Sequence, residues 1–65
     1  MFGYEIEVAI INRSRFLSAH VTFNYNYPQF TTEKAAEREA LQVDVPQEIT
    51  RRGWGKDRIE TRILH

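Results

Sequence analysis

Hydrophobic and polar residues alternate in two long stretches near the start of the chain. Between Phe2 and Asn12 one face carries large apolar residues at even-numbered positions, and the other face carries Glu5, Glu7 and Ala9. The second stretch, residues 16–27, has these residues on its apolar side: Leu17, Ala19, Val21, Phe23, Tyr25 and Tyr27. A period of two is typical of a strand with one buried face. The two stretches therefore predict a long antiparallel hairpin that ends before Pro28, since proline cannot donate to a ladder.

The period becomes helical after the hairpin. Residues 32–42 are rich in strong helix formers, and Thr31 is the predicted N-cap. Ala36, Ala40 and Val43 fall at helical spacing. These three residues predict the helix face that lies against the sheet.

A second, shorter helix is predicted to follow. Asp44 is its expected N-cap, and a proline in the first turn is tolerated because its missing N–H has no partner there. Gly53 provides the left-handed residue with which helices commonly end. Trp54, the next residue, is expected to pack on Ile49.

The last segment predicts a third strand, because Ile59, Thr61 and Ile63 alternate with charged residues. Its position in the sheet is inferred from charge. Glu5 and Glu7 lie on the outer face of the first strand, and the third strand carries Arg58 and Arg62 on the corresponding face.

Opposite charges on neighbouring strands stabilise a sheet by about 0.2–1 kcal/mol per pair. The third strand is therefore predicted beside the first. The alternative places it parallel to the second strand through a right-handed crossover. The predicted fold is a small ββαβ domain of the α+β class, with a three-stranded, mainly antiparallel sheet in the order 2-1-3. One long and one short helix are expected to cover one face.

Length and composition further limit the classes of protein to which the chain could belong. The chain has 65 residues, with nine Lys and Arg against nine Asp and Glu, and no cysteine. We expect a single domain over residues 1–65, too small for a dinucleotide-binding fold. A disulfide framework or a thiolate zinc site needs cysteine, and the two histidines, His20 and His65, are far apart, so no metal or cofactor is expected. The longest apolar run, residues 8–11, is too short to span a bilayer, and a cytoplasmic location without membrane contact is expected.

Enzymatic chemistry has little support in the residue pattern. Ser18 and His20 point the same way but lie about 7 Å apart along a strand, and no glycine-rich nucleophile turn accompanies them. Glu5 and Glu7 are explained by surface ion pairs with nearby arginines. We therefore predict that the protein is not an enzyme.

The strongest candidate surface is a basic cluster near the C-terminus. Arginine beside tryptophan suits contacts with carboxylates, phosphates or stacked bases. Solvation and favourable interaction with the helix dipole explain the same charges without any partner. The candidate binding residues are Arg51, Arg52, Trp54, Lys56, Arg58 and Arg62.

A second aromatic group, Phe23, Tyr25 and Tyr27, has the spacing at which a sheet stacks bases. It shares the predicted core face, so a packing role is favoured.

The leading functional hypothesis is a small protein–protein interaction module, of the kind common among bacterial and phage accessory or inhibitor proteins. It would bind through a sheet edge or the basic cluster, and a homodimer through an edge is a further possibility. The alternative is a nucleic-acid-binding domain that uses the same cluster.

Overall fold

The structure is a computed structural model and describes residues 3–64, so Phe2 lies outside the described residues. The two long strands and the short third strand occur where the alternation predicts them. The elements, in chain order, are β1 (Gly3–Asn12), β2 (Leu17–Asn26), α1 (Glu33–Glu39), a π-helical segment η1 (Ala40–Asp44), α2 (Val45–Arg51) and β3 (Ile59–Ile63).

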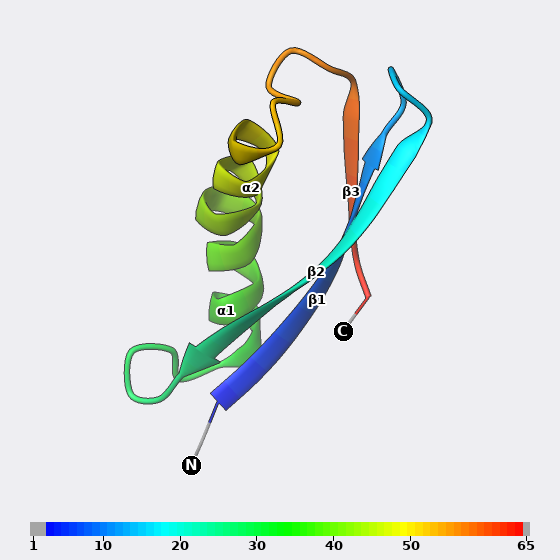
Figure 1. Cartoon of the computed structure of the whole chain (residues 1–65). Helices are drawn as coiled ribbons and strands as arrows, with labels where there is room; N and C mark the ends of the chain where they lie inside the picture. Colours follow the sequence, from blue (N-terminus) through cyan, green and yellow to red (C-terminus); the bar gives the residue numbers. More distant parts are fainter. Residues whose placement is uncertain (1–2, 65) are drawn as a thin grey trace.

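The three strands form one antiparallel sheet in the predicted order β2-β1-β3. Ile6 lies opposite Phe23 and Val8 opposite Val21, so the bulky apolar residues of the hairpin share one face. Figure 1 shows the helical segments along this face and no element on the other. The predicted α+β class and one-sided cover are therefore confirmed.

The strand order is correct, but different charged residues support it. Arg62 lies opposite Ala9 rather than opposite a glutamate. The ion pair that bridges β1 and β3 joins the Arg13 guanidinium to the Glu60 carboxylate at 2.9 Å. It forms between Arg13, just beyond the end of β1, and the residue after the first position of β3.

The prediction of two separate helices is wrong. Residues 33–51 form one continuous helix, and Asp44 has helical dihedral angles and makes no capping bond. The Val45 N–H donates to the Ala40 carbonyl, five residues back, so the helix widens just before Pro46. In a regular α-helix the ring of Pro46 would clash with the carbonyl four residues earlier. A widened turn relieves such a clash, so the chain continues without a break.

The widened turn also changes which side chains face the sheet. Ala36 and Ala40 are buried as predicted, but Val43 is 37% exposed and Val45 is buried in its place. The spacing of inward residues is thus four and then five, because the π turn inserts one residue. At the helix start the N-cap is Thr32 rather than Thr31, and its hydroxyl accepts the Ala35 N–H at 3.1 Å.

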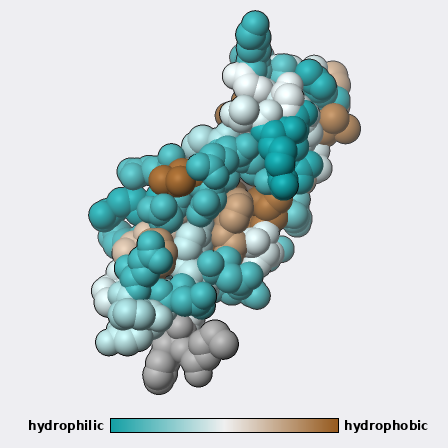
Figure 2. Space-filling view, turned by 60° about the vertical axis from the view of Figure 1, so that its left-hand side comes forward, coloured by the Kyte–Doolittle hydropathy of each residue, from teal (hydrophilic) through white to brown (hydrophobic). Residues whose placement is uncertain are grey.

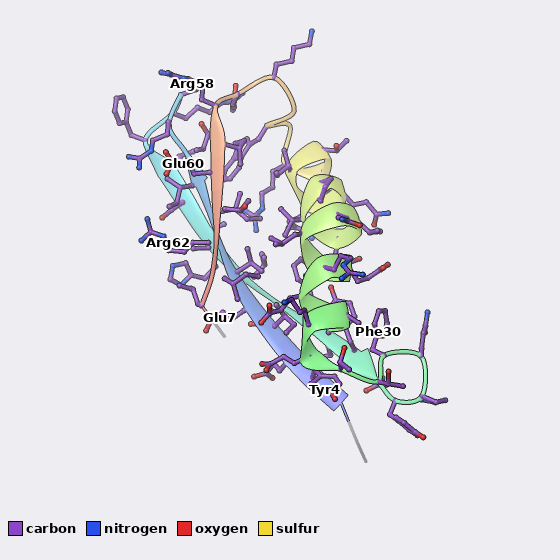
Figure 3. All side chains as sticks on the ribbon, turned by 180° about the vertical axis from the view of Figure 1, so that it is seen from behind. Tyr4, Glu7, Phe30, Arg58, Glu60 and Arg62 are labelled. Atoms are coloured by element: carbon purple, nitrogen blue, oxygen red, sulfur yellow. The ribbon has the colours of Figure 1, made fainter. Side chains whose placement is uncertain are left out.

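Asp44 bonds to a side chain of the sheet instead of capping a helix. Its carboxylate accepts a hydrogen bond from the Tyr25 hydroxyl. Burial, and then this hydrogen bond, raise the pKa of Tyr25 above its ordinary value. The Tyr25 ring also makes an edge contact with Phe30, with ring centroids 4.9 Å apart. This end of the molecule, where Figure 3 places Tyr4 and Phe30 beside the helix start, is closed by aromatic packing.

The other end of the core is closed by the turn after α2. Gly53 has φ 78°, its N–H donates to the Thr50 carbonyl, and the Trp54 N–H donates to the Ile49 carbonyl. These two bonds make a Schellman motif, as the sequence predicts. The buried core residues are Ile6, Val8, Ile10, Tyr25, Ala36, Ala40, Val45 and Trp54.

Candidate interaction surfaces

The predicted basic cluster is divided in space. Arg51 and Arg52, at the end of α2, both bind the Glu48 carboxylate, at 2.6 and 3.1 Å. The hydrogen bond from Arg51 is the main reason that the pKa of Glu48 is lowered. This part of the cluster is therefore engaged in an intrahelical network that neutralises some of its charge.

Trp54 belongs to the core rather than to an open surface. Only 6% of the residue is exposed. The Arg52 guanidinium carbon lies 5.4 Å from its ring centroid, which is within cation–π range. Trp54 therefore positions Arg52 and closes the core, and little of its ring is left for a partner.

The remaining predicted residues, Lys56, Arg58 and Arg62, are exposed. Within residues 3–64 the structure gives none of them an ion pair at 4 Å or less. Figure 3 shows Arg58, Glu60 and Arg62 in succession along β3, with Arg58 at the end where the strand begins. Lys56 and Arg58 thus lie apart from Arg62, toward one end of the sheet.

The sequence analysis did not identify two further cations that lie in the same region as Lys56 and Arg58. Arg13 and Arg15 lie in the turn between β1 and β2, more than forty residues away along the chain. The Arg13 N–H donates to the Arg58 carbonyl at 2.8 Å, so the turn and the start of β3 are side by side, as Figure 1 also shows. The predicted order 2-1-3 already placed both at one end of the sheet, and this signal was enough to find them.

We call this region the hairpin tip. It consists of Arg13, Arg15, Phe16, Leu17, Lys56 and Arg58. Phe16 is 94% exposed and Leu17 is 50% exposed. Phe16 also has φ 58°, in the left-handed region. A bulky residue rarely adopts this conformation, and an aromatic ring gains nothing by lying in water.

The hairpin tip is held by several side chains. Asn12 is fully buried, and its side chain accepts the Arg15 N–H at 3.0 Å and donates to the Asp57 carboxylate at 2.9 Å. Arg15 forms an ion pair with Asp57 at 2.9 Å, and the Ser14 hydroxyl accepts the Arg58 N–H at 2.9 Å. The turn that presents Phe16 is therefore tied to the connection between α2 and β3.

The ion pairs that hold the hairpin tip also neutralise the acidic side chains around it. A hydrogen bond from Arg13 is the largest cause of the lowered pKa of Glu60. Asp57 is bound by Arg15. Lys56 and Arg58, at the same end of the sheet as Phe16, make no ion pair within residues 3–64.

A second candidate surface is the free edge of β2. The Glu7 carbonyl accepts the Leu64 N–H at 2.7 Å, and Arg13 also bonds toward β3. Because bonding direction alternates along an antiparallel strand, the odd-numbered residues of β1 face β3 and the even-numbered residues face β2. It follows from the register that the even-numbered residues of β2 direct their backbone groups away from the sheet. They are Ser18, His20, Thr22, Asn24 and Asn26, of which the Asn26 carbonyl already accepts the Phe30 N–H at 3.1 Å.

The free edge of β2 carries few features that discourage pairing. Residues 17–26 contain no Lys, Arg, Asp, Glu or Pro, and all ten pair with β1 without a bulge. On the helix side a shallow groove of about 210 Å³ runs beside it, lined by Phe23, Asp44, Gln47, Glu48 and Arg51. Natural edge strands usually carry charges, prolines or bulges that block addition of another strand.

Other kinds of site have little basis in residues 3–64. They contain no group of three or more His, Asp or Glu side chains arranged to hold a metal ion. No helix in this range is both long and apolar enough to cross a membrane. The face in Figure 2 is largely hydrophilic, with small separate apolar patches. Comparisons with protein-family models, curated proteins and solved structures find no match to this chain.

Proposed function

We propose that this chain is a non-enzymatic protein-interaction module that receives a partner's strand at the free edge of β2. The observation that carries the proposal is the ten-residue edge without charge, proline or bulge. An added strand gains backbone hydrogen bonds from the outward groups of His20, Thr22 and their alternate neighbours. Strand addition of this kind is a common mode of peptide recognition.

The opposite edge of the sheet makes the preference for β2 specific. β3 has only five residues, and two of them, Glu60 and Arg62, are charged. Short, charged edges are the usual protection against unwanted pairing. The sheet thus has one protected edge and one open edge.

The surroundings of β2 indicate the chemistry of the partner strand. On the helix side its alternate residues would approach half-buried Phe23 and the polar residues Gln47 and Arg51. On the outer side they would meet Thr22 and the polar residues beside it. An uncharged strand with β-branched or aromatic residues fits both sides, and a second copy of β2 is itself such a strand.

The experiment uses the intact chain and, as probe, a synthetic peptide with the sequence of residues 17–26. Sedimentation equilibrium measures self-association, and titration calorimetry measures peptide binding. The substitution Thr22→Pro removes an outward N–H without touching the β1–β2 ladder, so both associations are expected to be lost while the fold remains.

Thr61→Pro is the matched control, because Thr61 occupies an outward-bonding position on the protected edge. It is expected to leave association unchanged. If the wild-type chain stays monomeric at high concentration and does not bind the peptide, the proposed strand addition is wrong. Equal loss in both proline variants would indicate damage to the fold instead of an edge contact.

A further inference from the structure

The hairpin tip combines two features that stability does not explain. The Phe16 ring is 94% exposed, and its backbone has a left-handed conformation that β-carbon-bearing residues avoid. Glycine or asparagine is the usual residue at such a position. An unfavourable conformation that the surrounding structure maintains is a reason to look for a function at that position.

The ring is presented by a braced turn. Asn12 holds the turn from inside, and Arg13 and Arg15 tie it to Glu60 and Asp57 across the sheet end. A side chain on such a turn loses less conformational freedom on binding than one on a mobile loop. Phe16 is therefore well placed to act as an aromatic contact.

The charge around Phe16 identifies the chemistry of the partner. The ion pairs of Arg13 and Arg15 neutralise the nearby acids, and Lys56 and Arg58 remain without an ion pair within residues 3–64. A flat exposed ring at the same end of the sheet as two exposed cations complements a chain of anions that also carries flat, apolar rings. We propose that the hairpin tip binds single-stranded nucleic acid, with Phe16 stacked on a base and Lys56 and Arg58 contacting phosphates.

An anionic membrane is the less favoured partner. Even a single myristoyl chain gives only marginal membrane binding, and Phe16 with half-exposed Leu17 offers less apolar surface than such a chain. Recognition of anionic lipids typically uses clusters of about four to eight cations. The tip has two cations without an ion pair in the described range.

An acidic protein surface is also less favoured. Specific protein interfaces bury about 1,200–2,000 Å² in total, and a convex turn of a few residues provides little of that area. A stacked base and two phosphate contacts need no large interface. This site is separate from the free edge of β2 and does not depend on strand addition.

The test is fluorescence anisotropy of a labelled oligothymidylate with the intact chain at about 50 and 200 mM salt. We expect binding at the lower salt that weakens at the higher salt. Phe16→Gly keeps a residue that tolerates the left-handed backbone, and it is expected to weaken binding roughly tenfold through loss of stacking. Phe16→Trp is expected to retain binding. Arg58→Gln is expected to reduce the slope of log affinity against log salt by about 0.7.

Lys34→Gln, which removes an exposed cation from the helix, is the matched charge control and is expected to change the affinity by less than Arg58→Gln does. Thr22→Pro is expected to bind the oligonucleotide as the wild type does, which separates this test from that of strand addition. Absence of binding at low salt would overturn the proposal, as would equal affinity of Phe16→Gly and the wild type. Phe16-dependent binding to anionic phosphatidylserine vesicles without oligonucleotide binding would also overturn it.

Discussion

Among residues 3–64, Gly53 and Phe16 are the two with φ in the left-handed region. At Gly53 the residue type, the dihedral angle and the hydrogen bonds agree, and Trp54 behind it is buried. At Phe16 the hydrogen bonds hold a similar conformation, but the residue has a β-carbon and its ring lies in water. The first turn is explained by folding alone. The second is explained only if Phe16 contributes something other than stability.

The largest expected effect lies on the Gly53 side of this comparison. Trp54→Ala removes a large buried side chain and leaves a cavity between the helix and the sheet. We expect a loss of about 3–5 kcal/mol in the free energy of unfolding, which is comparable to the whole stability of a domain of this size. Thermal and urea denaturation followed by far-ultraviolet circular dichroism measure it. An unchanged melting temperature would contradict a core role for Trp54.

Asn12 tests what holds Phe16 in place. Asn12→Ala removes one acceptor and one donor in a fully buried position, so the Arg15 N–H loses its partner and the Asp57 carboxylate keeps its ion pair with Arg15 but loses one hydrogen bond. We expect a loss of about 1–3 kcal/mol and faster hydrogen exchange of the Arg15 amide. Asn24→Ala, an exposed asparagine on β2, is the control and is expected to have a small effect. Slow exchange in Asn12→Ala would show that the turn is held by other contacts.

Gly53→Ala isolates the cost of the left-handed conformation. A β-carbon at Gly53 meets no atom within 4 Å, so the dihedral angle is the source of the expected penalty. We expect a loss of about 1–2 kcal/mol in unfolding free energy. Gly55→Ala is the matched control, because Gly55 has the same open space without a positive φ, and its effect is expected to stay within about 0.5 kcal/mol. Equal losses in the two variants would contradict this explanation.

The agreement at Gly53 also indicates how much of the fold is predictable from the sequence. The strands, their common apolar face and the helix end depend on local patterns that the structure preserves, so they were predicted correctly. The continuous helix was not predicted, because the π turn before Pro46 is a local rearrangement without a distinct sequence pattern. Because of that turn, Val45 is buried in the core and Val43 is not.

The candidate surface was only half visible in the sequence. Lys56 and Arg58 stood out because they are close together along the chain. Arg13 and Phe16 are distant from them along the chain, and the predicted pairing of β1 with β3 is what places them at the same end of the sheet. The sequence predicts that Trp54 packs on Ile49 and also makes it a binding candidate, and its burial shows that the packing role holds.

The smallest expected effect is an increase in the free energy of unfolding, and it concerns Phe16. Phe16→Asn replaces a ring in water by a residue that tolerates the left-handed region. Because Phe16 has little packing to lose, we expect the free energy of unfolding to rise by about 0.5 kcal/mol. Urea denaturation of this variant and of Leu41→Asn, an exposed apolar residue of the helix without a positive φ, separates relief of the backbone from removal of exposed apolar surface. A clear loss of stability in Phe16→Asn would mean that the ring packs within the fold, and the reason for assigning it to a partner would disappear.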